Sequence, residues 1–179
     1  MIITYHGGGF VKVQQGDLVV ALNPDGSNQV RIGGKDPFII NGPGEYEVSN
    51  VFVQGFGVSG PGKKINTIYR LSLDGLRLVH WGTLGDDKIS EAVASGIGEV
   101  DILFVPLSPA SSIGGLAAAC RLALTFQPKI IIPLAESETV LRPFLKEAGA
   151  ENIKPADKVV LKKKDVLEKE GEVIVLAAV

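Results

Sequence analysis

Side chains that bind metals or transfer protons at neutral pH are scarce in this sequence. Its 179 residues include two histidines and one cysteine. His80 is followed closely by Asp86 and Asp87, and Glu136 lies further along the chain. A catalytic metal ion needs three protein ligands and one open position, so His80, one of the two aspartates and Glu136 could together hold a single ion. The chemistry that such a site allows is metal-assisted hydrolysis.

The same residue types also have structural interpretations. The two adjacent aspartates precede a predicted helix, where they fit N-terminal capping and the helix dipole. His80 ends a predicted strand, where it either forms hydrogen bonds that hold the turn before Gly82 or serves as a general base or ligand. His6 stands beside three glycines and is predicted to be a polar turn residue. Cys120 falls on an apolar helix face, which predicts a buried, unreactive thiol.

The overall composition indicates a folded domain. Hydrophobic residues make up 45% of the chain and charged residues 21%, with a formal net charge of −2, so the chain can bury enough apolar surface to offset its ordering entropy. We expect one domain over residues 1–179. A cytoplasmic location is expected because there is no basic leader, no apolar run of the ~20 residues that a membrane span needs, and only one cysteine. The near-neutral charge argues against nucleic acid as a partner, and we expect no membrane association.

The pattern of turns and apolar residues predicts a strand-rich first half and a helix-containing second half. Glycines concentrate before Gly115. Short β-rich runs between turn residues predict strands over 2–4, 10–13, 18–22, 38–40, 46–48, 51–54, 67–73 and 76–80. Asp74-Gly75 supplies a two-residue hairpin turn between the last two runs. Helices are expected over 89–97, 116–126 and 137–148, with strands over 102–105, 129–132, 157–161 and 173–176.

This order of elements predicts a layered α/β sandwich rather than a doubly wound sheet, because antiparallel hairpins come first and alternating strands and helices follow. A dinucleotide-binding unit would open with a strand, a glycine-rich turn and a helix. Here Gly7-Gly8-Gly9 opens onto a strand instead. We therefore expect these glycines to form a turn and not a phosphate-binding loop.

Five strings in serial order carry a resemblance to a known family: ITYHGGGF at 3–10, VALNP at 20–24, GPGEYEV at 42–48, LVHWG at 78–82 and IIIP at 130–133. Together they resemble the metallo-β-lactamase-fold hydrolases, in the branch of ascorbate-6-phosphate lactonase-like proteins and "Zn-dependent hydrolases". The resemblance spans nearly the whole chain. It implies an αββα sandwich of two mixed β-sheets flanked by helices.

The resemblance also implies metal ligands that this sequence lacks. The family places most of them in a His-x-His-x-Asp-His string after a strand ending in Asp-Pro, whereas this strand ends in Asn23-Pro24 and residues 25–36 contain no histidine. A metal-bridging Asp in a His-x-Gly-Asp string is replaced by Thr83. The final histidine, expected after Ile132-Pro133, is absent from the segment that ends in Glu136. No cofactor is therefore expected.

The residues predicted to form the site come from the possible single-ion site and from the strings that carry the resemblance. His80 and Asp86 are the candidate catalytic residues. The candidate binding-pocket residues are Asn23, Gly42, Glu45, Thr83 and Glu136. Alternation along a strand puts Glu45 and Glu47 on one solvated face and Tyr46 on the packed face, and the preceding Gly-Pro-Gly string is expected to shape the turn.

The leading hypothesis is a metal-free, degenerate member of the metallo-β-lactamase fold that acts as a non-catalytic binding or interaction module for a small molecule or a protein. The alternative is a zinc- or other metal-dependent hydrolase of the lactone or phosphoester class, with a mononuclear site from His80, Asp86 or Asp87, and Glu136. A third hypothesis is a homo-oligomer, because exposed edge strands invite pairing.

Overall fold

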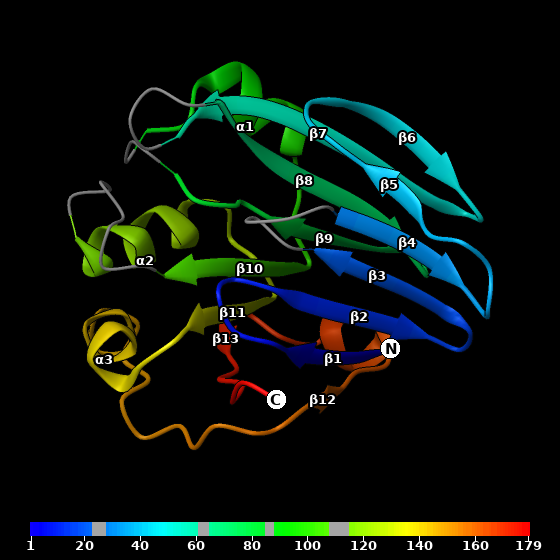
Figure 1. Cartoon of the computed structure of the whole chain (residues 1–179). Helices are drawn as coiled ribbons and strands as arrows, with labels where there is room; N and C mark the ends of the chain where they lie inside the picture. The colour runs from blue at the N-terminus through cyan, green and yellow to red at the C-terminus, as the bar shows by residue number, and fades with distance from the viewer. Residues whose placement is uncertain (23–27, 61–64, 85–87, 108–114) are drawn as a thin grey trace.

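The computed structural model describes residues 1–22, 28–60, 65–84, 88–107 and 115–179. Two β-sheets pack face to face, and helices lie beside them (Figure 1). The predicted α/β sandwich of two sheets flanked by helices is thus confirmed. Asn23, Asp86 and Asp87 lie outside the described residues, so their predicted roles stay predictions.

The first sheet contains six strands in the order β12-β1-β2-β3-β4-β5. They are β1 (Ile2–Tyr5), β2 (Val11–Gln15), β3 (Leu18–Leu22), β4 (Asn28–Ile32), β5 (Phe38–Ile40) and β12 (Val159–Val160). Every neighbouring pair in this sheet is antiparallel. Alternate residues such as Val11, Val13 and Val20 are buried, as expected where one face covers the core.

The second sheet contains seven strands in the order β13-β11-β10-β9-β8-β7-β6. They are β6 (Gly44–Val48), β7 (Val51–Ser59), β8 (Ile65–Leu73), β9 (Leu76–His80), β10 (Ile102–Leu107), β11 (Ile130–Ala135) and β13 (Glu172–Val173). Strands β6 to β9 pair antiparallel, whereas β9, β10, β11 and β13 pair parallel. The resemblance implied two mixed sheets. This sheet is mixed, whereas the first pairs all its neighbouring strands antiparallel.

Helices cover the outer face of the second sheet. They are α1 (Glu91–Ile97), α2 (Leu116–Thr125) and α3 (Glu138–Glu147), with a short fourth helix, α4 (Lys163–Leu167), near the N-terminus (Figure 1). One core fills the space between the two sheets and includes Tyr5 and Phe104. A second core joins the second sheet to the helices and includes Trp81, Cys120 and Phe144. No helix in the described ranges is long and apolar enough to span a membrane.

Most expected elements are present, and the differences have local causes. The expected strand over 129–132 continues through Pro133 to Ala135. The carbonyl of Ile131 accepts a hydrogen bond from the Ile174 N–H, on the side of β11 that faces β13. The backbone of Pro133, two residues later, faces the same side but lies beyond the end of β13. Proline has no N–H, and no hydrogen bond of the sheet is lost at this position. Strand β4 was not predicted. The last two expected strands shrink to Val159–Val160 and Glu172–Val173.

Candidate functional site

His80 ends strand β9 at the point where the second sheet changes from antiparallel to parallel pairing. Its neighbours in register are Tyr69 on β8 and Phe104 on β10. The His80 side chain is buried, and its ring centroid lies 6.3 Å from that of Phe104. Topology thus places the imidazole at the carboxyl end of the first parallel strand, where open α/β sheets commonly bind ligands.

Both ring nitrogens of His80 have main-chain partners. Nε2 lies 2.9 Å from the carbonyl oxygen of Gly9, and the Gly82 N–H lies 3.2 Å from Nδ1. A carbonyl can only accept and an amide N–H can only donate, so Nε2 carries the proton and Nδ1 is the acceptor. Burial lowers the pKa of His80 to about 4, although the Gly9 hydrogen bond opposes this shift. The ring is neutral at pH 7, and the expected hydrogen bond to the turn before Gly82 is present.

The Gly9 carbonyl reaches His80 because of the turn between β1 and β2. Gly7, Gly8 and Gly9 all have positive φ, at 81°, 56° and 77°, which glycine adopts without steric cost. Phe10 N–H donates to the Gly7 carbonyl at 2.8 Å and closes the turn. The prediction that these glycines form a turn is confirmed.

Asn66 fixes the chain that follows His80. Its Nδ2 donates to the Trp81 carbonyl at 2.9 Å, and its Oδ1 accepts from the Thr83 N–H at 3.1 Å. Gly82 has φ +61°, and a Cβ at this position would collide with the Asn66 side chain. The two hydrogen bonds of Asn66 therefore fix the backbone conformation of residues 81–83.

The segment 41–43 forms the opposite rim. The Gly42 N–H donates to the Tyr69 hydroxyl at 2.9 Å, and the Tyr46 hydroxyl lies 2.6 Å from the Asn41 carbonyl. Gly42 has φ +77°. A Cβ on Gly55 of β7 would lie 2.7 Å from the Gly42 oxygen, so only glycine at 55 lets this segment approach the sheet. The predicted shaping role of the Gly-Pro-Gly string is confirmed at this turn.

Between these two rims lies a pocket of about 360 Å³, called here the His80 pocket. Its lining comes from β4, the segment before β6, the start of β8 and the end of β9: Asn28, Asn41, Gly42, Pro43, Ile65, Asn66, Thr67, Tyr69, His80 and Gly82. The volume falls at the low end of the range of small-molecule sites. Asn66, Thr67 and Tyr69, which carry much of the polar lining, were missed by the sequence analysis.

The structure brings only some of the predicted site residues together. Gly42 and His80 line one pocket, and Thr83 is tied to it through Asn66. Glu45 lies on the exposed face of β6, where Gln54 Nε2 donates to its Oε1 at 3.0 Å. Glu136 lines a different pocket. The predicted alternation of exposed Glu45 and Glu47 with a packed Tyr46 is confirmed.

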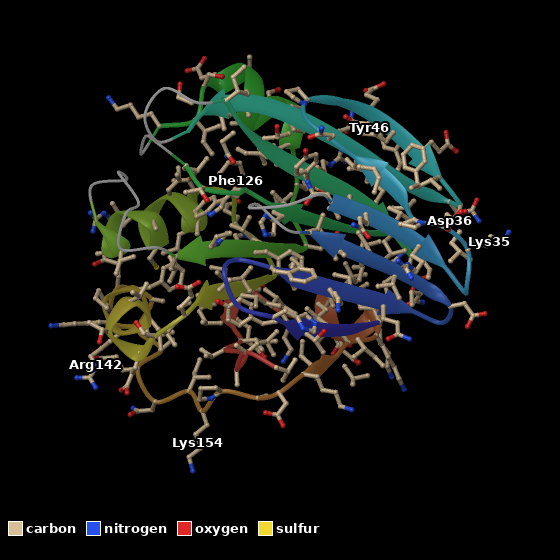
Figure 2. The ribbon with its side chains drawn as sticks, in the orientation of Figure 1. Lys35, Asp36, Tyr46, Phe126, Arg142 and Lys154 are labelled. Atoms are coloured by element: carbon tan, nitrogen blue, oxygen red, sulfur yellow. The ribbon has the colours of Figure 1, made fainter. Side chains whose placement is uncertain are left out.

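The second pocket, called here the Glu136 pocket, has a volume of about 410 Å³ and lies between the end of β11, helix α3 and the C-terminal segment. Leu141, Leu145 and Ile153 contribute apolar lining. Glu136 and Arg142 stand on its exposed rim, and Arg142 points outward from α3 (Figure 2). The rim also carries Glu138, which accepts a hydrogen bond from Arg142 at 2.7 Å.

The described residues do not fit the metal chemistry of the alternative hypothesis. Within the described ranges, no three His, Cys, Asp or Glu side chains are placed to hold an ion. The Nδ1 lone pair of His80 points to Gly82, and its Nε2 carries a proton. A metal ligand must offer a free lone pair, so binding an ion would first require breaking one of these two bonds.

Comparison with known proteins agrees with this fold. Residues 17–135 match the family described as "Beta-lactamase superfamily domain". A crystal structure from Thermotoga maritima, of a protein named as a Zn-dependent hydrolase of the metallo-beta-lactamase superfamily, superposes with a TM-score of 0.76 at 21% identity, over 98% of this chain and 97% of that one. Igni18, a metallo hydrolase from Ignicoccus hospitalis, superposes with a TM-score of 0.57 at 10% identity, over 90% and 99% of the two chains. No curated protein gives a significant match.

At these identities the two structures show a shared fold and nothing about shared activity. The family match is stronger evidence, because it rests on the sequence itself. It runs from the turn between β2 and β3 to the end of β11 and includes every described lining residue of the His80 pocket. This chain belongs to the beta-lactamase superfamily domain family.

Proposed function

We propose that this chain is a metal-free, non-catalytic member of its superfamily that binds a small molecule in the His80 pocket. The observation that carries the proposal is the pair of main-chain hydrogen bonds at the His80 ring. A general base needs a free lone pair near its substrate, and a metal ligand needs one directed at the ion. The ring satisfies neither requirement in this arrangement.

The burial of His80 supports the same proposal. A general acid or base works best with a pKa near the operating pH, whereas burial lowers the pKa of His80 to about 4. His80 then serves as a connector between the Gly9 turn and the Gly82 turn, and it forms one wall of the pocket. We also propose a cytoplasmic location. The single cysteine, Cys120 on α2, is a free thiol buried in the core between the second sheet and the helices, which fits a reducing compartment.

Metal content and the tautomer of His80 test the proposal together. Protein purified without chelator is measured by elemental analysis, before and after incubation with zinc, manganese or iron and desalting. The imidazole is followed by long-range ¹H–¹⁵N correlation spectra. We expect a small fraction of one metal equivalent and a neutral Nε2–H ring throughout about pH 5.5 to 8.

The alternative hydrolase predicts different results in the same samples. One metal equivalent per chain, with loss of the Nε2 proton or a shift of the Nδ1 resonance, would contradict the proposal. So would metal-dependent turnover of lactone or phosphodiester substrates that disappears in both His80→Ala and Asp86→Ala. Glu136→Ala serves as a further variant, because Glu136 belongs to the alternative site but lines the other pocket.

A further inference from the structure

We infer that the His80 pocket binds a small uncharged polyhydroxylated molecule, a sugar or polyol, and that Tyr69 and Thr67 determine its specificity. This inference rests on the proposed function, because it names the class of ligand for the same pocket. Four properties of the described lining support it: its lack of charge, a hydroxyl proton that no described residue accepts, its amide groups and its limited size.

The described lining of the pocket contains no Asp, Glu, Lys or Arg side chain. His80 is its one titratable imidazole, and burial holds that ring neutral at pH 7. A charged ligand would lose part of its hydration here without gaining a countercharge from the described lining, which is unfavourable. An uncharged ligand avoids this cost.

The Tyr69 hydroxyl supplies a donor that none of the described residues uses. Its oxygen accepts the Gly42 N–H at 2.9 Å, and no acceptor for its own proton is found among the described residues. The ring of Tyr69 is buried in the core between the sheets, with 7% of the residue exposed. Tyr69 therefore presents a fixed hydroxyl at the pocket instead of an aromatic face, and a fixed donor favours a ligand oxygen at one position.

Amide and hydroxyl groups dominate the rest of the polar lining. Asn28, Asn41, Asn66 and Thr67 contribute them. A side-chain amide combines a donor and an acceptor, which matches the hydroxyl groups of a polyol, since each of those both donates and accepts. Asn66 is held by residues 81 and 83, and no acceptor for its second N–H is found among the described residues, so this N–H can serve a ligand.

The size of the pocket limits the ligand. A volume of about 360 Å³ suits a molecule with a single small ring or a short chain and not an oligomer, because small-molecule sites begin at about 300 Å³. Pro43 and Ile65 add an apolar patch to the lining, against which the C–H face of such a molecule can pack.

Amide NMR titration of the ¹⁵N-labelled full chain tests the inference. The neutral probes are D-glucose, myo-inositol and glycerol, and the charged probes of matched size are D-gluconate, D-glucosamine and glucose 6-phosphate. The Gly42 and Thr83 amides report directly, because they donate to Tyr69 and Asn66. We expect at least one neutral probe to shift both amides saturably, with an affinity at least about tenfold above that of its charged analogues.

Three variants connect these shifts to the named side chains. Tyr69→Phe removes the proposed donor, and we expect affinity for the neutral probe to fall at least about tenfold. Thr67→Val keeps the methyl group and replaces the hydroxyl with a second methyl group, with an expected loss of about threefold. Tyr5→Phe is the matched control, because it removes a buried tyrosine hydroxyl that does not line the pocket. Its affinity should equal that of the unaltered protein.

Each contrary result identifies which statement fails. Tighter binding of a charged probe at the same amides would overturn the ligand class and leave the proposed function standing. No saturable shift with any neutral probe up to about 50 mM, or equal loss of affinity in Tyr5→Phe and Tyr69→Phe, would also overturn the inference. Failure of the proposed function appears separately, as one metal equivalent bound per chain with a perturbed His80 ring.

Discussion

The His80 pocket and the Glu136 pocket differ in how their polar side chains are held. In the first, the side chains of His80, Asn66 and Tyr69 each bond to main-chain atoms of a neighbouring segment. In the second, Glu138 and Arg142 form an ion pair with each other, and both side chains are more than 70% exposed. Figure 2 shows Tyr46, beside the first pocket, and Arg142, beside the second, on opposite sides of the view.

The polar side chains of the first pocket are hydrogen-bonded to the main chain and contribute to the stability of the fold, whereas those of the second pocket lie on the exposed surface. A buried polar group that loses its partner retains the full cost of desolvation, whereas an exposed pair can return to water. Substitutions at the His80 pocket should therefore change stability, and chemically similar substitutions at the Glu136 pocket should not.

The largest effect is expected for His80→Leu, which leaves the Gly9 carbonyl and the Gly82 N–H without partners in a buried site. Each orphaned group costs about 1–3 kcal/mol, so we expect the free energy of unfolding to fall by about 4 kcal/mol in urea titrations. Glu136→Leu is the matched control, with a change within about 0.5 kcal/mol because the residue is exposed. Equal losses in the two variants would contradict the comparison.

Lowering the pH should reduce the free energy of unfolding through His80, by somewhat less than the His80→Leu substitution does. The pKa of His80 is about 4 in the folded chain and about 6.5 in the unfolded chain, so between these values only the unfolded state takes up the proton. The resulting stability is complete above pH 6.5 and is lost as the pH falls toward 4, a total of about 3 kcal/mol.

His80→Gln isolates this contribution. Glutamine cannot titrate but retains an N–H donor for the Gly9 carbonyl. The free energy of unfolding is measured by urea titration from pH 7 to 4. Its decrease over this range should be smaller in the variant than in the unaltered protein, by about 3 kcal/mol, the amount that His80 contributes. Parallel curves for the two proteins would show that His80 has the same pKa in the folded and the unfolded chain and that its ring is not held as described.

A smaller effect is expected from closing the space beneath the 41–43 segment. In Gly55→Ala the new Cβ would lie 2.7 Å from the main-chain oxygen of Gly42, and we expect a loss of about 2 kcal/mol together with a shifted Gly42 amide resonance. Gly57→Ala, two residues along the same strand, is the control. There the nearest atom is a Pro43 ring carbon at 3.2 Å, so the loss should stay below about 1 kcal/mol. A larger loss in Gly57→Ala than in Gly55→Ala would contradict the close approach of Gly42 to Gly55.

Local sequence signals predicted the helices and strands well and the pocket poorly, because the elements depend on neighbouring residues and the pocket depends on residues far apart in the sequence. The hairpin through Asp74-Gly75 could be predicted because its signal is two adjacent residues that readily adopt positive φ, and the structure gives them φ of 54° and 67°. Strand β4 was missed because its short run mixes polar residues with two apolar ones, and it is a strand only through pairing with β3 and β5.

The pocket depends on contacts that span longer separations. Asn66 holds Trp81, 15 positions away, and Tyr69 holds Gly42, 27 positions away. The His80–Gly9 bond joins residues 71 positions apart. Alignment with the family identified His80 and Gly42 but could not reveal Asn66 or Tyr69, because their roles exist only after the two sheets have packed.

The smallest effect is expected at the rim of the Glu136 pocket. Glu138→Gln removes an ion pair between two exposed side chains one helical turn apart on α3. Such a pair gains little in water, because solvent screens the charges and both long side chains lose rotamer freedom. We expect the Tm to change by less than about 1 °C, in low salt and in high salt alike. A loss as large as that of Gly55→Ala would show that the rim is built into the fold in the same way as the His80 pocket, and the distinction between the two sites would then fail.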